Sequence, residues 1–289
     1  MAIQFRDVTF YYNKKTKAAL KNINLDINEK DDFISIIGKI GSGKSTLVQL
    51  MNGLLIPSEG YLNIFGHKID KKTSPQNLIS LKQKIGLVFQ FPEYQLFENT
   101  VLKDVMFGPK NFNKNDNEAK RKAIQVLKQV GIHEYLFEQS PFKLSEGQQR
   151  KVAIAGVLAI EPSILILDEP TRGLDVNSQK EIMTILKNKN QKERNTIMFI
   201  THDMDLVAEY ANKILFLDRG EIFFFDLKKI FFMKYKLSEF GLSEPQSFKI
   251  LKFLNKKLGI PFEPKFSYEE LLQYLKKIYK GYTKTNGDG

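Results

Sequence analysis

Short apolar runs rich in β-branched and aromatic residues alternate along the chain with segments of helical period. The runs that predict strands are residues 3–10, 23–27, 33–37, 61–64, 85–89, 164–167, 197–200 and 213–217. Several are almost entirely apolar, as in strands buried on both faces of a sheet. The order, strands first and then strands alternating with helices, predicts an α/β fold with a parallel central sheet.

Two segments show the helical period clearly. Residues 118–130 place Ala123 and Leu127 on one face and are followed by Gly131, a residue that favours a helix C-terminus. Residues 177–188 lie between two predicted strands and have the length of a parallel crossover. These helices therefore connect strands of the predicted sheet.

The character of the chain changes after about residue 226. Helical patterns broken by Gly and Pro follow, and no further strand is predicted. We therefore divide the chain into a main domain of residues 1–225 and a mostly helical extension of residues 226–289. The side chains expected to be buried in the extension are Phe231, Phe232, Phe240, Phe248, Phe253 and Leu254.

Composition limits the classes of protein to consider. The 289 residues are 42% hydrophobic, enough for a packed core, and no cysteine is present for disulfides or thiolate-bound zinc. The chain lacks a signal-peptide layout and any apolar run of about 18 residues, so we expect a soluble or peripheral protein. A net charge of +11 allows nucleic acid, an anionic membrane or a phosphorylated ligand as partner. Only six of the 44 basic residues are arginine, and a lysine-rich solvated surface is the simpler interpretation.

A phosphate-binding motif lies between the apolar strand 33–37 and the helical run 46–52. The match to GxxxxGK[ST] comprises Gly38, Lys39, Ile40, Gly41, Ser42, Gly43, Lys44 and Ser45. Its glycines let successive backbone N–H groups and a helix N-terminus face phosphates. Lys44 would reach the β and γ phosphates, and Ser45 would offer its hydroxyl to Mg²⁺. The alternative, a Gly-rich turn without function, does not explain the flanking strand and helix.

Two adjacent acids follow the apolar strand 164–167. Asp168 and Glu169 stand where this strand leaves the core, and burying both charges without a cation would be costly. We expect Asp168 to hold Mg²⁺, mainly through water, and Glu169 to polarise the attacking water as a general base. An acidic junction between strand and loop is the alternative.

The segment Leu144-Ser145-Glu146-Gly147-Gln148 resembles the LSGGQ signature of ATP-binding-cassette (ABC) ATPases. Other motifs of that family occur in the matching order. Their positions here are Tyr12 for the aromatic that stacks on adenine, Thr46 after the P-loop, Gln90 for the Q-loop, Asp175 for the D-loop and His202 for the switch histidine. The order and spacing of these motifs over about 200 residues identify the chain as a P-loop NTPase of the ABC type.

The resemblance implies a fold, a cofactor and a mechanism. The family fold has a mixed sheet with helices, an antiparallel β subdomain and an α-helical subdomain, here at about residues 91–160. It implies binding of ATP and Mg²⁺, with Gln90 also near the metal, and hydrolysis of ATP to ADP and phosphate between two head-to-tail subunits. His202 would contact the γ-phosphate and Asp175 the partner's P-loop. The signature residues Ser145, Glu146, Gly147 and Gln148 would act on the partner's ATP.

Glu146 departs from the pattern, because it replaces the first glycine of the signature. A carboxylate near phosphates repels them, whereas an acid in the first turn of a helix suits the helix dipole. If this side chain points to solvent, we expect mild weakening of one composite site and not its loss.

The segment 89–112 narrows the resemblance further. Residues 89–98 read FQFPEYQLFE, and Thr100-Val101 and 107–112 follow in a pattern similar to energy-coupling factor (ECF) transporter ATPases of prokaryotes, in particular the second type of A subunit. This resemblance implies a dimer of two related chains on the cytoplasmic face of the cell membrane. It implies a membrane scaffold, the T component, which docks coupling helices carrying arginine, and S components that capture vitamins or transition-metal ions.

The docking groove would lie beside the Q-loop. Phe91, Tyr94 and Phe97, together with Pro92, would form an apolar wall, and Glu93 and Glu98 would pair with arginine of the scaffold. The alternative is that these aromatic residues belong to the core and that both acids are solvated.

Two further functions compete with transport. A cassette protein acting on nucleic acid or the ribosome would fit the basic charge, but such proteins usually carry two cassettes, long coiled-coil insertions or zinc-binding cysteines. A degenerate, regulatory cassette would fit Glu146 but not the intact Lys44, Asp168, Glu169 and His202. We therefore expect an active ATPase subunit and no nucleic-acid partner.

Overall fold

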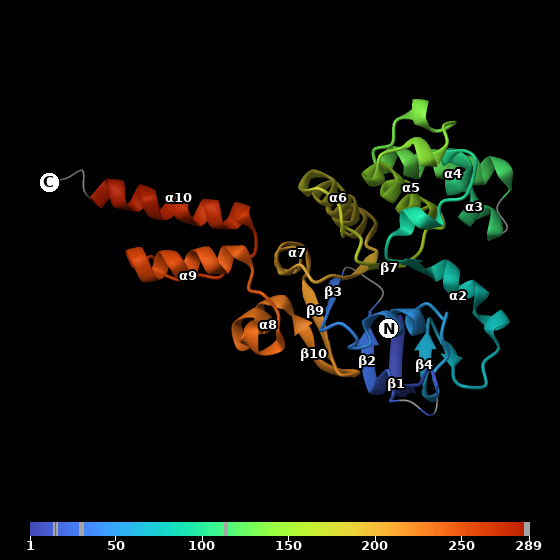
Figure 1. Cartoon of the computed structure of the whole chain (residues 1–289), viewed down its shortest axis with the longest axis horizontal. Helices are drawn as coiled ribbons and strands as arrows, with labels where there is room; N and C mark the ends of the chain where they lie inside the picture. The colour runs from blue at the N-terminus through green and yellow to red at the C-terminus, as the bar shows by residue number, and fades with distance from the viewer. Residues whose placement is uncertain (14, 16, 29–31, 113–114, 286–289) are drawn as a thin grey trace.

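The computed structural model describes residues 1–13, 15, 17–28, 32–112 and 115–285. Two sheets lie in the middle of the molecule, with a helical lobe on one side and the C-terminal helices on the other (Figure 1). Among the described residues, no helix combines the length and the apolar character that are needed to cross a membrane.

The first sheet is antiparallel and has the strand order β2-β1-β4-β5. Its strands are β1 (Ile3–Phe10), β2 (Leu20–Ile27), β4 (Glu59–Ile64) and β5 (His67–Ile69). In β2, buried Leu20, Ile23, Leu25 and Ile27 are separated by exposed or half-buried polar residues, so one face of the sheet packs on the core.

The second sheet has the order β10-β9-β3-β8-β7-β6, parallel except for β10, which is antiparallel to β9. Its strands are β3 (Phe33–Ile37), β6 (Ile85–Val88), β7 (Ile164–Asp168), β8 (Thr196–Ile200), β9 (Lys213–Asp218) and β10 (Glu221–Leu227). Every residue of β3 and β8 is buried. The predicted parallel sheet is confirmed, whereas β5 and β10 were not predicted.

Helices cover the sheets and form two additional lobes. The α-helices are α1 (Lys44–Met51), α2 (Ile79–Lys84), α3 (Val101–Asn111), α4 (Asp116–Gln129), α5 (Glu146–Leu158), α6 (Val176–Glu193), α7 (Met204–Tyr210), α8 (Lys228–Lys234), α9 (Gln246–Leu258) and α10 (Tyr268–Thr285). Short 3₁₀ helices are η1 (Pro75–Leu78), η2 (Pro92–Gln95), η3 (Glu134–Leu136), η4 (Pro141–Lys143) and η5 (Leu237–Phe240). Figure 1 shows α3, α4 and α5 as one lobe, in the range where the helical subdomain was expected.

The central sheet carries a hydrophobic core on each face. Alternate residues of β3 belong to different clusters, since Phe33 and Ile37 pack on one side and Ile34 and Ile36 on the other. The first of these clusters continues from the helical lobe through the sheet into the extension. The fold therefore matches the ABC-type α/β architecture that the sequence predicts.

The C-terminal extension shares the core of the main domain. Residues 225 and 226, between which the sequence placed the domain boundary, both lie within β10. Phe216 of β9 packs its ring edge-on against Phe231 and Phe240, with centroids 5.7 and 5.0 Å apart. The expectation that Phe253 is buried is wrong, because its side chain is 60% exposed on α9.

Candidate functional site: a nucleotide cleft

The P-loop connects β3 to α1 through two glycines that tolerate no side chain. Gly38 has φ +148°, and a Cβ there would lie 2.3 Å from the carbonyl oxygen of Leu217. Gly43 has φ +102°, and its Cβ would lie 2.7 Å from the carbonyl oxygen of Ala19. The loop can therefore wrap closely only because both positions are glycine.

Gly38→Ala is expected to weaken ATP binding at least about tenfold, because the new Cβ would displace the loop by a fraction of an ångström or more. Titration of the purified protein with a fluorescent ATP analogue measures this. Gly41→Ala is the matched control: its φ of +78° is also left-handed, but nothing lies within 4 Å of a Cβ there. Equal loss in both variants would show that backbone strain and not close approach decides the effect.

Lys44 and Ser45 lie at the start of α1, where a phosphate chain would approach. The Lys44 ammonium donates to the carbonyl oxygens of Gly38 and Lys39 at 2.8 and 2.9 Å, and burial lowers its pKa despite the nearby acids. The Ser45 hydroxyl donates to Asp168 Oδ2 at 2.9 Å. Burial raises the pKa of Asp168, against the effects of Ser45 and Lys44.

Glu169 and His202 face each other across the ends of β7 and β8. Glu169 Oε1 lies 3.4 Å from His202 Nε2, and the Glu169 side chain is largely buried. Burial, and then the charge of Asp168, raise the pKa of Glu169 to about 7, while burial lowers the pKa of His202. Glu169 also has φ +51°, a strained backbone held by its N–H bond to Ile200 O. A carboxylate with a pKa near neutrality suits a general base.

These residues surround a cleft of about 520 Å³. Of the predicted site residues, the cleft is lined by Ile40, Gly41, Lys44, Ser45, Gln90, Asp168, Glu169 and His202. The other lining residues were not predicted: Thr171, Arg172, Gln179, Ile200, Thr201 and Asp203. They lie within a few residues of predicted ones, so proximity in sequence was the only signal available.

Tyr12 is not among the residues that line this cleft, and neither are the P-loop residues Lys39, Ser42 and Gly43. The Tyr12 hydroxyl lies 3.0 Å from Thr46 Oγ1, and the ring, 64% exposed, packs edge-on against Phe10. An exposed aromatic face fixed beside the P-loop helix is compatible with stacking on a base. Lys39, Ser42 and Gly43 complete the loop.

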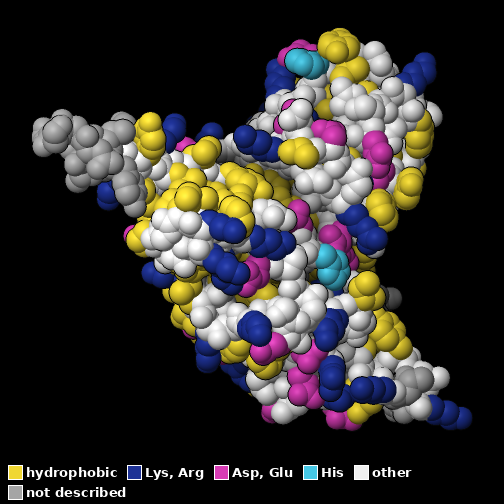
Figure 2. All heavy atoms as spheres, turned by 60° about the vertical axis from the view of Figure 1, so that its left-hand side comes forward, with side chains coloured by type: hydrophobic (Ala, Val, Ile, Leu, Met, Phe, Trp, Pro, Cys, Tyr) yellow, Lys and Arg dark blue, Asp and Glu magenta, His cyan; other side chains and the backbone are white. Residues whose placement is uncertain are grey.

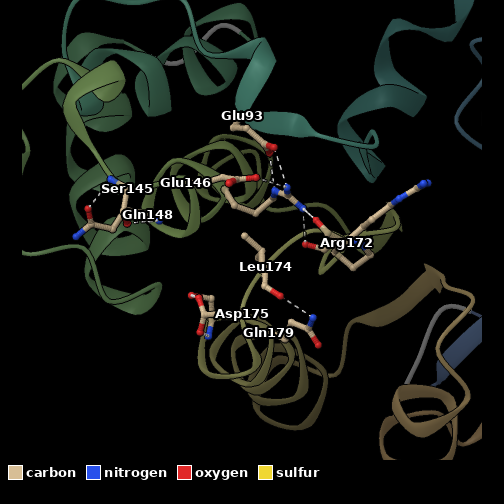
Figure 3. A network of polar contacts seen from close by, with 11 residues as sticks. Glu93, Ser145, Glu146, Gln148, Arg172, Leu174, Asp175 and Gln179 are labelled. Carbon is tan, nitrogen blue, oxygen red and sulfur yellow. Dashed lines mark hydrogen bonds and ion pairs between the residues drawn. The ribbon is translucent and has the colours of Figure 1, made fainter.

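The signature residues start α5 and lie outside the cleft. Ser145 and Gln148 form a reciprocal capping box, in which Ser145 Oγ accepts from the Gln148 N–H and Gln148 Oε1 accepts from the Ser145 N–H. None of Ser145, Glu146, Gly147 and Gln148 lines the cleft of its own chain. Figure 3 shows the capping box on α5, apart from the D-loop.

Asp175 begins α6 as its N-cap. Its Oδ1 accepts from the N–H groups of Asn177 and Ser178, and its Oδ2 accepts from the Ser178 hydroxyl at 2.6 Å. These hydrogen bonds lower the pKa of the exposed Asp175 carboxyl. Its contact with a partner's P-loop stays a prediction.

The expected role of Glu93 is wrong. Its carboxylate is 4% exposed and holds Arg150 of α5, with Nε to Oε2 at 2.5 Å and Nη2 donating to Oε1 at 2.7 Å (Figure 3). Because both oxygens serve this buried pair, Glu93 is not available to an arginine of another protein. Sequence reasoning missed the pair because its members stand 57 residues apart.

An apolar groove of about 300 Å³ lies between η2, α3 and α5. Of the aromatic residues predicted for it, Phe97 lines the groove, whereas Phe91 and Tyr94 do not. Glu98 is half-buried near the rim, and its N–H and that of Phe97 donate to Asp104, which does line the groove. The other walls come from α3, α5 and the residues that directly follow them, namely Phe107, Gly108, Asn111, Phe112, Val152, Ala153, Gly156, Val157 and Ile160.

Fold and cleft together define a P-loop ATPase of the ABC type. The sequence pattern of the ABC transporter family matches residues 20–172. An energy-coupling factor transporter ATP-binding protein EcfA2 of Lactobacillus acidophilus is 49% identical over 85% of this chain and 87% of that protein. The EcfA2 protein of Staphylococcus epidermidis is 40% identical over 97% of this chain and 98% of that protein.

Solved structures agree with these relatives. The cbiO1 protein of Clostridium perfringens, described as part of the ABC transporter complex cbiONQ, matches with a TM-score of 0.74 and 34% identity over 89% of this chain and 95% of that one. The cassette MJ0796, dimeric in a post-hydrolysis state bound to ADP and phosphate, matches with a TM-score of 0.68 and 33% identity over 78% and 98%. The chain belongs to the family of energy-coupling factor transporter ATP-binding proteins. It is an ATP-binding ATPase subunit whose hydrolysis is coupled to transport.

Proposed function

We propose that this chain forms one half of a dimer of two related ATPase chains, each ATP lying between the P-loop of one chain and the signature of the other. The observation that carries this proposal is the separation of Ser145 and Gly147 from the cleft of their own chain. Ser145 is exposed at the positive end of α5, where backbone N–H groups can meet an anion. A second chain would supply the missing half of each site.

Mg²⁺ fits the residues beside the P-loop. The Ser45 hydroxyl and the Asp168 carboxylate, 2.9 Å apart, are the hard oxygen ligands that Mg²⁺ prefers, and the cleft leaves room for phosphate oxygens and water. Gln90, exposed on the same cleft, would offer a further oxygen ligand. The bound cation would neutralise charge that develops on the β and γ oxygens.

The groove between η2, α3 and α5 is the proposed docking site for a coupling helix of a membrane scaffold, the T component. Its apolar walls suit a helix, and the partly buried carboxyls of Glu98 and Asp104 suit a basic side chain at its rim. Burial raises the pKa of Asp104, which an arginine placed nearby would lower again. The chain would then lie on the cytoplasmic face of the membrane, and S components would determine whether vitamins or transition-metal ions are carried.

Glu98→Lys is expected to lower transport about tenfold, as for a partly exposed ion pair reversed to repulsion, while basal ATPase changes less than about twofold. Uptake of labelled cargo and phosphate release are measured on the same reconstituted transporter. Glu98→Gln removes the charge without reversing it, so its uptake rate should lie between those of the wild-type protein and Glu98→Lys. Equal loss of uptake and ATPase would show that Glu98 acts on hydrolysis and not on docking.

The extension offers a contact for the second ATPase chain. Apolar side chains gather on the face of the C-terminal helices, beside lysines (Figure 2). Those exposed on α9 and α10 include Phe253, Leu258, Tyr268, Leu272 and Tyr279. An exposed patch of this kind marks an interaction surface. Affinity purification from native membranes tests the assembly: one related ATPase chain and one polytopic scaffold are expected, and recovery of this chain alone would contradict it.

A further inference from the structure

Arg150 is a fully buried cation outside the nucleotide cleft. Its side chain is 0% exposed, and it belongs to α5, one turn after the signature. A buried guanidinium needs partners for its five N–H groups, because each unpaired donor would carry a desolvation cost. The partners of Arg150 come from the Q-loop, from the turn after Glu169 and from the start of its own helix α5.

The first partner is the Q-loop. Arg150 Nη2 donates a hydrogen bond to Glu93 Oε1 in η2 at 2.7 Å, and Arg150 Nε forms an ion contact with Glu93 Oε2 at 2.5 Å. Phe91, two residues before Glu93, places its ring 5.7 Å from Arg150 Cζ and 5.8 Å from Arg172 Cζ. Gln90, which precedes Phe91, lines the cleft. The Q-loop therefore touches the guanidinium on one side and the cleft on the other.

The second partner is the turn after Glu169. Arg150 Nη1 donates to the carbonyl oxygens of Pro170 at 3.1 Å and Arg172 at 3.3 Å. Pro170 directly follows Glu169, whose φ of +51° requires support from its surroundings. These hydrogen bonds hold the backbone that directly follows Glu169.

The third partner is the signature. Glu146 Oε1 lies 3.9 Å from Arg150 Nη2, one helical turn away, and 3.9 Å from where a Cβ of Gly173 would stand. Figure 3 shows Glu93 and Glu146 meeting the same network from η2 and α5. The unusual acid of the signature is therefore directed toward a cation of its own chain.

The same short helix η2 serves both the groove and this network. Pro92 and Gln95 line the apolar groove, while Glu93 between them binds Arg150. On α5, Val152 and Ala153 also line the groove just after Arg150. Because buried residues are closely packed, a shift of η2 against a docked helix must move Glu93 and with it the guanidinium.

We propose that Arg150 is a positioning residue that couples the groove to catalysis: it holds the turn after Glu169 in a place set by Glu93 of the Q-loop. Movement of η2 changes the aim of the Glu169 carboxylate through Pro170 and Arg172. The coupling role rests on the proposed docking of a membrane component in the groove. The hold on the turn after Glu169 does not depend on that docking.

The test uses the assembled transporter with Glu93→Gln, which keeps the shape but loses the charge. We expect kcat for ATP to fall about tenfold to a hundredfold, because small misplacements of catalytic groups have effects of that size, with KM changed less than about twofold. Amide hydrogen exchange in residues 169–174 should become faster. Arg150→Lys, which keeps the charge but not the planar fork, should lower kcat in the same way.

Lys151→Met is the matched control, since it removes an ion pair with Glu181 from the next residue of the same helix. It should leave kcat and the exchange of residues 169–174 unchanged. An unchanged kcat in Glu93→Gln, or a fall explained by the fraction of unfolded protein in thermal melts, would overturn the proposal. Co-purification of the membrane scaffold is recorded in parallel: its absence with the wild-type chain contradicts docking, whereas an unchanged kcat with the scaffold present contradicts the role of Arg150.

Discussion

Glu169→Gln is expected to lower the ATPase rate of the assembled transporter about a hundredfold or more, the usual loss on removing a general base, while ATP still binds. The carboxylate stands at the end of β7 beside Asp168 and 3.4 Å from His202, and its pKa of about 7 lets it accept a proton at neutral pH. Glutamine keeps the shape but cannot accept that proton. Phosphate release and equilibrium binding of ATP, measured on the same preparation, separate the two effects.

Glu221→Gln is the matched control, because this exposed acid of β10 lies outside the cleft. It should leave the rate unchanged. If Glu169→Gln also leaves the rate unchanged, the P-loop site of this chain is not catalytic, and a regulatory role gains support.

Glu169→Gln should also change the folding stability of the nucleotide-free protein. The pKa of Glu169 rises from 4.5 to about 7 in the folded chain, mainly through burial, so the folded state binds more protons between these values. The contribution of Glu169 to the free energy of unfolding therefore falls as pH rises from about 4.5 to 7. Glu169→Gln should stabilise the apo protein by roughly 3 kcal/mol at pH 8, since each pKa unit corresponds to ~1.4 kcal/mol, and have little effect near pH 4.5. Urea unfolding at both pH values measures this, and equal shifts at both would contradict the raised pKa.

The grouping of Lys44, Ser45, Asp168 and Glu169 around one cleft could be predicted because the structural requirements of each segment are local. A loop with Gly38 and Gly43 at positive φ leads directly into the helix that carries Lys44, so the motif specifies its own geometry. Asp168 and Glu169 follow an apolar strand, which fixes their place at the edge of the sheet. In each case the functional side chain and the strand or loop that positions it lie within about ten residues of each other in the sequence.

The surroundings of the Q-loop could not be predicted in the same way. Whether Glu93 faces solvent or the core depends on Arg150, which α5 brings to it from another part of the chain. Likewise, most walls of the groove are residues of α3 and α5 that carry no motif. A pattern in one segment does not reveal which charge a distant segment buries against it.

The sequence placed the boundary of the extension inside β10 for a physical reason. Residues 221–227 form β10 at the edge of the sheet, with no fully buried position, so they lack the uniform apolar character of the central strands. Their aromatic side chains instead join the rings of the extension: Phe224 packs on Phe231, and Phe223 on Phe240. The extension is thus continuous with the core although its sequence reads as a separate helical unit.

Phe231→Ala is therefore expected to destabilise the whole chain by about 3–5 kcal/mol, the usual cost of removing a buried phenyl ring. Phe231 is 0% exposed and its ring lies within 6 Å of the rings of Phe216, Phe224, Phe232 and Tyr235. Phe253→Ala is the matched control on the same extension, where a 60% exposed side chain should change stability by less than about 0.5 kcal/mol. Urea unfolding, followed by both circular dichroism and ATP-analogue binding, should show one shared transition that moves to lower urea in Phe231→Ala. Two transitions, with ATP binding retained after the first, would instead show that the extension folds as a domain of its own.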